Sequence, residues 1–240
     1  KELQKNNVDI SNIRTETGKN SNYHYVLWYA ADRTILVRHE AFTYDLGQIE
    51  EPKWIYLSSL GSNSLPFHEQ IADFLDAHPD TRLVFQPGTF QIKIGSEALT
   101  RIYKRTEIFF CNVEEAQMIL NETSHDLPTL LRGISALGPR YTVITDQIKG
   151  AYAYDGTTMW YMPIYPGDAY ERTGAGDAFA STIMSAVALG TPFEEALRWG
   201  PVNSASVIKY VGAQKGLLTR EQLEDDLKKA PEDYHPQPLQ

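Results

Sequence analysis

The sequence has few cysteines and no long apolar runs, the features that mark disulfide-rich and membrane-spanning proteins. It has a single cysteine, Cys111, so no disulfide can form within the chain, and this fits a reducing cytosol. No apolar run approaches the roughly 20 residues that a membrane-spanning helix needs, and the first residues lack the pattern of a signal peptide. We therefore expect a soluble, cytoplasmic protein with no membrane partner.

Basic residues are also in deficit. Lys and Arg number 22 against 31 Asp and Glu, which gives a formal net charge of −9. Such a chain is poorly suited to nonspecific binding of the nucleic-acid phosphate backbone, so nucleic acid is not an expected partner. The negative charge does not exclude a nucleotide that is held locally by backbone N–H groups.

Short apolar segments alternate with helical segments along most of the chain. Its 240 residues are enough to bury one sizeable core, so a single domain is expected. The expected strands are residues 25–30, 34–38, 54–58, 82–85, 107–111, 141–145, 151–154 and 159–162. The expected helices include residues 66–77, 97–105 and 127–137 and one that begins at Val113. Such alternation is typical of a mostly parallel sheet covered by helices on both faces. Residues 231–240 contain three prolines and are expected to form a flexible tail.

The most informative segment is Arg-Thr-Gly-Ala-Gly-Asp-Ala-Phe, residues 172–179. Gly174 and Gly176 permit backbone conformations in which several N–H groups converge at the start of the following helix, where the helix dipole favours an anion. Asp177 would repel a phosphate, but it suits a base that takes a proton from an attacking hydroxyl. Alternatively, the glycines and the acidic residue only start a helix.

A second polar motif, Asn112-Val113-Glu114-Glu115, follows an apolar strand. Ligands of open α/β sheets collect at the carboxyl ends of the strands, and a carboxylate there can hold Mg²⁺ through water. The alternative is an ordinary capping box, with Asn112 at the N-cap and Glu115 three residues later.

The segment Thr-Gly-Ala-Gly-Asp-Ala-Phe, followed by a long helix rich in small residues, resembles the signature of the PfkB family of carbohydrate kinases. The resemblance extends over most of the chain. It implies a ribokinase-like, three-layer α/β/α sandwich with a partial β lid over residues 20–45. It further implies that Asp177 is the catalytic base and that the anion hole for the transferred phosphoryl group is formed by the amides of Gly174, Ala175, Gly176 and Asp177. Asn112 and Glu115 match the family's Asn-x-x-Glu motif, which is associated with Mg²⁺ and phosphate.

The resemblance to the PfkB family also covers segments that bind the nucleotide in that family. Residues 145–150 resemble the family's Thr-x-Gly-x-Lys-Gly turn beside ATP, with Gln147 in place of the first glycine. The nucleotide-binding residues that this implies are Thr145, Asp146, Lys149 and Gly150. Asn203 resembles a residue that borders the adenine, although a polar side chain satisfied inside the protein is the alternative.

Glu171 and Arg172 replace the commoner Asp-Thr of the family. In the family the acidic residue belongs to a monovalent-cation region, so Glu171 is a candidate for K⁺. Arg172 could pair with phosphate oxygens or with Glu171 on the surface.

One part of the family pattern has no counterpart, because nothing in residues 1–22 resembles the opening strand and the Gly-Gly-Asn segment that hold the sugar. Loss of that strand would leave backbone groups of the sheet unpaired. We therefore expect one of three situations: the sequence is an incomplete record of a longer kinase, another chain supplies the strand, or a partner covers the gap.

The sequence thus predicts an ATP- and Mg²⁺-dependent kinase that phosphorylates a hydroxyl group of a sugar. A nucleoside kinase acting on an adenosine-like substrate and a non-catalytic, nucleotide-binding relative remain alternatives. The missing sugar segment favours the non-catalytic relative, and the intact anion turn with Asp177 favours the kinase. The aromatic segment Tyr23–Tyr29 corresponds to the lid, which implies a homodimer through this hairpin or a cover for the substrate pocket.

Overall fold

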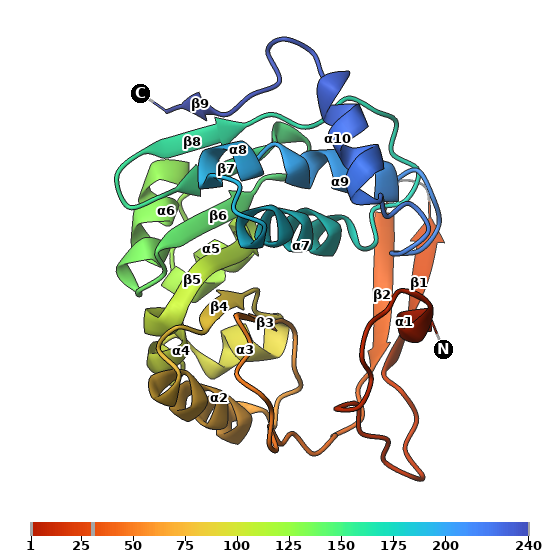
Figure 1. Cartoon of the computed structure of the whole chain (residues 1–240), viewed down its shortest axis with the longest axis vertical. Helices are drawn as coiled ribbons and strands as arrows, with labels where there is room; N and C mark the ends of the chain where they lie inside the picture. Colours follow the sequence, from red (N-terminus) through yellow and green to blue (C-terminus); the bar gives the residue numbers. More distant parts are fainter. Residues whose placement is uncertain (1, 30–31, 240) are drawn as a thin grey trace. The chain divides into compact units, whose positions relative to one another are not determined.

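The computed structural model describes residues 2–29 and 32–239 and divides into two compact units, residues 1–44 and 45–240 (Figure 1). The single domain expected from the sequence stays a prediction. The first unit contains α1 (Glu2–Lys5) and a hairpin of β1 (Tyr23–Tyr29) and β2 (Asp32–Arg38). The antiparallel pairing confirms the expected hairpin, while part of its expected turn, at residues 30 and 31, lies outside the described residues.

One face of the hairpin carries exposed apolar side chains. Tyr25 lies opposite Leu36 in the antiparallel register, and these side chains are 64% and 52% exposed. Leu27, on the same face of β1, is 54% exposed. An apolar strand face of this kind is suited to a contact with another surface, and the homodimer through the hairpin stays a prediction.

The second unit is built on a seven-stranded sheet whose spatial order follows the chain from β3 to β9. Four parallel strands come first: β3 (Trp54–Leu57), β4 (Arg82–Phe85), β5 (Thr106–Asn112) and β6 (Tyr141–Thr145). Each following strand runs antiparallel to the one before it: β7 (Ala151–Tyr154), β8 (Met159–Met162) and β9 (Gln237–Pro238). As a result, β3–β6 and β8 all end at the same edge of the sheet.

Helices connect and follow these strands. Between β3 and β6 lie α2 (Leu65–Ala77), α3 (Thr89–Ile94), α4 (Thr100–Arg105), α5 (Val113–Leu120) and α6 (Leu127–Ala136). The 3₁₀ turn η1 (Gln147–Lys149) precedes β7, and β8 is followed by α7 (Ala175–Ala188), α8 (Phe193–Ala196), α9 (Trp199–Val207) and α10 (Arg220–Lys228). The helix expected over 97–105 begins only at Thr100, and α3 was not predicted. No helix in the described ranges combines the length and the apolar character needed to cross a bilayer.

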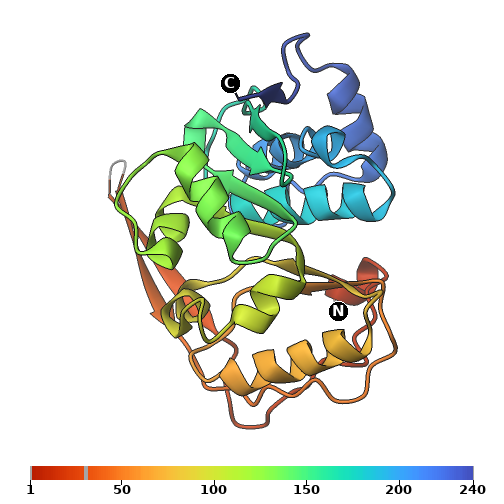
Figure 2. The same cartoon turned by 90° about the vertical axis from the view of Figure 1, so that its left-hand side faces the viewer.

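Side chains that alternate along the strands build two separate cores, one on each face of the sheet. Phe85 and Phe109 belong to the core beneath α2, α4, α5 and α6, while Val84 and Phe110 belong to the core beneath α7–α10 (Figures 1 and 2). Burial on both faces explains why the strands read as continuous apolar runs. The expected α/β/α sandwich is confirmed.

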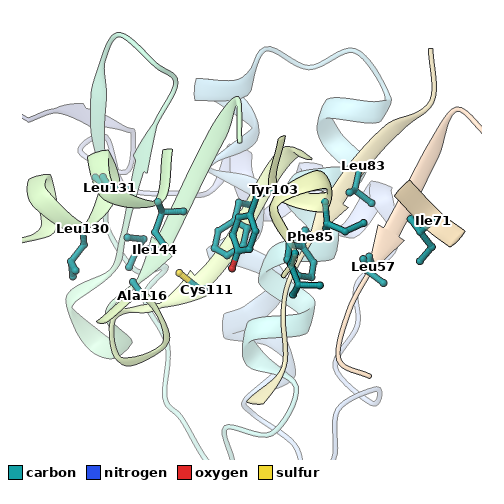
Figure 3. Packing of buried hydrophobic residues seen from close by; sticks show 14 of the residues in the cluster. Leu57, Ile71, Leu83, Phe85, Tyr103, Cys111, Ala116, Leu130, Leu131 and Ile144 are labelled. Atoms are coloured by element: carbon teal, nitrogen blue, oxygen red, sulfur yellow. The ribbon is translucent and has the colours of Figure 1, made fainter. Parts of the chain in front are cut away.

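An aromatic group that includes Phe85 and Tyr103 lies in the middle of the first core (Figure 3). The rings of Phe85, Tyr103 and Phe109 have centroids 5.4–5.7 Å apart, in edge-on and stacked arrangements. Such contacts add about 0.5–1.5 kcal/mol per pair to the burial of the rings. Cys111 lies in the same core, where burial raises the pKa of its thiol, so it is a packing residue. Phe85 is the last residue of β4, so this packing lies directly before Gln86.

The expected flexible tail is not what the structure contains. Tyr234 is only 3% exposed, its hydroxyl donates to the carbonyl oxygen of Arg198 at 2.7 Å, and its ring stands edge-on to Tyr165. Beyond it, Gln237 and Pro238 pair with β8. One aromatic residue among the prolines is enough to anchor the segment, because burying a ring outweighs the ordering of a few residues that proline already restricts.

Tyr234→Ala should lower the free energy of unfolding by about 3 kcal/mol, because it removes a buried ring and leaves a cavity. Tyr234→Phe keeps the ring and should cost about 1 kcal/mol for the lost hydrogen bond. Urea denaturation measures both. The exposed neighbour serves as control, since His235→Ala should change stability by less than about 0.5 kcal/mol; equal effects at the two positions would mean that the tail is not anchored in solution.

Candidate active site

Polar residues from several strands meet at the carboxyl edge of the sheet. Gln86 directly follows β4, Asn112 ends β5, and Asp146 directly follows β6. The loop after β8 starts from the same edge and leads into α7 at Ala175. The motifs singled out in the sequence therefore lie at one edge, where open α/β sheets bind ligands.

The start of α7 depends on a left-handed glycine. Gly174 is the N-cap residue with φ 81°, and a Cβ atom there would lie 2.5 Å from the Cβ of Ala213. Its carbonyl oxygen accepts the first helical hydrogen bond, from the N–H of Ala178 at 2.9 Å. Both the conformation and the contact exclude a side chain, so this glycine is required for the turn.

Several backbone donors of the turn are available. Within the described part of the chain, the N–H groups of Gly174, Gly176 and Asp177 have no acceptor, as expected at the start of a helix. The N–H of Ala175, expected with them in the anion hole, donates to the carbonyl oxygen of Arg172 at 3.2 Å. Gly176 is exposed, and a Cβ atom there would meet nothing within 4 Å. This part of the turn therefore lies at the protein surface.

Asp177 lies beside these donors with an exposed side chain. Its Oδ1 accepts a hydrogen bond from the Nε2 of Gln86 at 3.3 Å, and the hydroxyl of Tyr56 donates to the Oε1 of Gln86. Burial raises the pKa of Tyr56, and the nearby charge of Asp177 raises it further. Gln86 and Tyr56 were not predicted from the sequence. A polar residue directly after an apolar strand is the signal that marks Gln86.

Asn112 and Glu115 form the capping box that was the alternative interpretation. The N–H of Glu115 donates to Asn112 Oδ1 at 2.8 Å, and the N–H of Asn112 donates to Glu115 Oε2 at 2.9 Å. Burial raises the pKa of Glu115, and the charges of Glu114 and Asp177 add to the effect. The carboxyl groups of Glu115 and Asp177 are therefore close enough to interact electrostatically.

The donor set around Glu115 fits a metal ion held through water better than one held directly. Among the described residues, no group of three His, Cys, Asp or Glu side chains could enclose a metal. The capping box uses Oε2 of Glu115, so Oε1 is left to bind a ligand. The negative charge of Asp177 acts on the same carboxyl group. A hydrated Mg²⁺ near one or two carboxylates is the usual arrangement for this ion.

Asp146 is engaged by two basic side chains. It is 6% exposed, and its Oδ2 accepts from His125 Nε2 at 2.9 Å and from Lys149 Nζ at 3.2 Å. Burial by itself would raise the pKa of Asp146, but these hydrogen bonds outweigh it and lower the pKa. His125 lies 21 residues earlier, between two helices, and nothing in the sequence marks it.

In the turn between β6 and β7, Gln147 adopts a left-handed backbone conformation that glycine usually adopts. Gln147 has φ 49°, in the left-handed region, and its Nε2 donates to Glu114 Oε1 at 3.3 Å. Gly150 has φ 97°, and a Cβ atom there would lie 2.5 Å from the carbonyl oxygen of Met162. The position of Gly150 makes it a structural glycine. Thr145 is half-buried at the end of β6, with its hydroxyl 3.5 Å from the carbonyl oxygen of Cys111.

Glu171 links two loops. It is 9% exposed; its Oε1 accepts from the N–H of Thr173 at 2.7 Å and from that residue's hydroxyl, and its Oε2 accepts from the N–H of Gly212 at 3.2 Å. Arg172 is exposed. Its two suggested partners, phosphate oxygens and Glu171, both stay predictions. A K⁺ ion at Glu171 stays a prediction.

Asn203 is placed inside the protein. It is 6% exposed; its Nδ2 donates to Thr182 Oγ1 at 2.7 Å, and its Oδ1 accepts from the N–H of Leu218 at 3.0 Å. These contacts match the alternative of a satisfied side chain, and the role beside the adenine stays a prediction. The amide ties α9 to α7 and to the loop before α10, because a buried amide must find partners.

A family model described as "pfkB family carbohydrate kinase" matches residues 1–220. The chain belongs to this family. Among curated PfkB-type relatives, it is 35% identical over 118 residues to a cytidine kinase of Thermococcus kodakarensis, covering 48% of this chain and 42% of that protein. It is 25% identical over 154 residues to a nucleoside kinase of Methanocaldococcus jannaschii, covering 64% of this chain and 49% of that protein. The chain thus spans about half the length of these relatives.

Solved structures show the same fold. A ribokinase II of E. coli in its apo form superposes with a TM-score of 0.80 at 16% identity, covering 95% of this chain and 78% of that one. The same protein in complex with ATP and Mg²⁺ gives a TM-score of 0.75 at 17% identity, covering 95% and 77%. At this identity the likeness establishes the ribokinase-like fold.

The two glycines of the PfkB signature should respond differently to alanine. Gly174→Ala should lower the free energy of unfolding by at least about 2 kcal/mol, because of its left-handed φ and the contact with Ala213. Gly176→Ala meets open space and should be neutral or stabilising by about 0.5 kcal/mol. Urea denaturation of the two variants measures this difference, and a destabilised Gly176→Ala would contradict the open space described above.

Proposed function

We propose that this protein transfers the terminal phosphoryl group of ATP to a hydroxyl group of a sugar or nucleoside. The observation that carries the proposal is the arrangement at the start of α7, where the N–H groups of Gly174, Gly176 and Asp177 have no acceptor and lie beside the exposed carboxylate of Asp177. Free donors at a helix N-terminus suit a phosphoryl group, and a carboxylate beside them suits the removal of a proton. Family membership supports the same reaction class.

In the proposed reaction, Asp177 accepts the proton of the attacking hydroxyl, which thereby becomes a stronger nucleophile. The N–H groups of Gly176 and Asp177 donate to the phosphoryl oxygens as charge moves onto them. Removal of one such donor typically costs about 10²–10³ in rate. The exposed guanidinium of Arg172 could add a further donor to the same oxygens.

Glu115, with Asn112 in its capping box, would hold a hydrated Mg²⁺, which when bound neutralises phosphate charge. The role follows from the free Oε1 atom and the neighbouring negative charge of Asp177. On the nucleotide side, Lys149 presents an exposed ammonium group from the turn after β6. Asp146 would act by orienting Lys149 and His125, because its own carboxylate is buried against them.

Nucleosides are the first substrates to test, since the relatives matched by sequence are named cytidine kinase and nucleoside kinase. Sugars follow, in line with the family description. A homodimer through the hairpin of the first unit, activation by K⁺ at Glu171 and a cytoplasmic location are further parts of the proposal.

Asp177→Asn should reduce turnover by about 10²–10⁴-fold while leaving ATP binding nearly unchanged, because the amide cannot accept the hydroxyl proton but preserves the helix start. ATP consumption with a panel of nucleosides and sugars measures turnover, and calorimetric titration with ATP measures binding. Asp80→Asn is the matched control, since Asp80 is an exposed residue that precedes β4 at the opposite edge of the sheet.

Unchanged turnover in Asp177→Asn would remove the assigned base. ATP binding without consumption across the whole panel would instead favour a non-catalytic, nucleotide-binding relative.

Glu115→Gln should raise the Mg²⁺ concentration for half-maximal rate by about tenfold, in the range typical for residues that orient a metal's ligands. Glutamine can still complete the capping box, so the variant removes the charge and keeps the helix start. The rate as a function of Mg²⁺ concentration measures the change, with the exposed Glu97→Gln as control. If the Mg²⁺ dependence stays the same, the capping box is the whole role of Glu115.

A further inference from the structure

Three side chains from separate elements form a chain of hydrogen bonds that ends on the proposed base. Tyr56 of β3 donates its hydroxyl to Oε1 of Gln86, and Gln86 donates its Nε2 to Oδ1 of Asp177 at 3.3 Å. Gln86 and Asp177 are 91 residues apart in the sequence. Only the parallel order of β3 and β4 and the approach of α7 bring the three side chains together.

The direction of this chain of hydrogen bonds follows from chemistry. An ionised carboxylate can only accept, so the amide of Gln86 must turn its NH₂ group toward Asp177. Its carbonyl oxygen then faces Tyr56, whose hydroxyl must donate. A flipped amide would place a carbonyl oxygen against a carboxylate and leave two acceptors in contact. Tyr56 therefore stabilises the one amide orientation that supports the base.

Of Gln86 and Asp177, Gln86 is held more firmly by its surroundings. Its own N–H donates to the carbonyl oxygen of Leu57 at 2.9 Å, and the preceding Phe85 is fully buried among aromatic rings. The side chain of Gln86 is half-buried, whereas that of Asp177 is exposed in the first turn of α7. An exposed aspartate has several rotamers of similar energy, and one hydrogen bond from a fixed donor is enough to favour one of them.

We propose that Gln86 is a positioning residue for Asp177 and that Tyr56 fixes the amide orientation that this requires. The inference rests on the proposed kinase function, in which Asp177 is the base. With Oδ1 held by Gln86, Oδ2 is the oxygen left to accept the proton of the substrate hydroxyl.

Gln86→Met tests the donor, because methionine has a similar length and no hydrogen-bonding group at its end. Turnover should fall about tenfold, the loss expected for one hydrogen bond to a charged group, while the KM for ATP stays within about twofold. Gln86→Glu preserves size but sets a like charge against Asp177, and turnover should fall further. If turnover in both variants stays at the wild-type level, Gln86 only fills space and the proposal is wrong.

Tyr56→Phe should reduce turnover about threefold in the wild-type background and have little effect when combined with Gln86→Met, because both changes act on one hydrogen-bonded chain. Additive effects would overturn the role of Tyr56. Tyr154→Phe and Gln48→Met are matched controls. Tyr154 donates to Gly156 within the β7–β8 hairpin, and Gln48 is exposed; neither belongs to the proposed site.

A spectroscopic test separates this inference from the proposed function. The side-chain amide resonances of Gln86, assigned in a ¹H–¹⁵N spectrum by their loss in Gln86→Met, should shift in both Asp177→Asn and Tyr56→Phe. Resonances that do not move in either variant would rule out the hydrogen bonds, whatever the enzymatic activity. If the resonances shift but the protein phosphorylates no substrate, the hydrogen bonds are supported and the proposed kinase function is wrong.

Discussion

The parallel hydrogen bonding of β3 to β6 is the constraint on which the rest of the second unit depends. It brings the carboxyl ends of four successive strands to one edge, and the antiparallel pair β7–β8 returns the chain there before α7. Two buried cores hold the strands in register from both faces. Residues that the sequence separates widely, such as Gln86, Asn112 and Asp177, are thereby fixed near one another.

The chemistry at this edge balances negative side chains against oriented donors. Asp177 and Glu115 are close enough that the charge of Asp177 helps to raise the pKa of Glu115. Backbone N–H groups of Gly176 and Asp177 and the amide of Gln86 offset part of this repulsion. A phosphate with its metal ion would bring both signs of charge into such a site, and the proposed reaction would use both the donors and the carboxylates.

Much of the fold could be predicted because its signals are local. Apolar strands, the glycine turn before α7 and the capping motif at Asn112 each depend on neighbouring residues, and the structure contains all three. The roles of individual side chains were harder to predict. Ala175 and Asn203 were assigned to ligands, yet their polar groups bind within the protein, and Tyr234 anchors a segment whose composition suggested disorder. These outcomes depend on which partner lies nearby, and no local pattern contains that.

The sequence by itself determined the element order and the left-handed turn at Gly174, because each follows from backbone chemistry within a few residues, and it singles out Asp177 as the proposed base. Tertiary structure alone decided that Tyr56 and Gln86 would meet Asp177, that His125 would pair with Asp146, and that Glu171 would bind Thr173 and Gly212. The physical reason is the range of the forces involved. Propensity and capping act along the chain, whereas a side-chain hydrogen bond needs two atoms within about 3 Å, a distance that only packing sets.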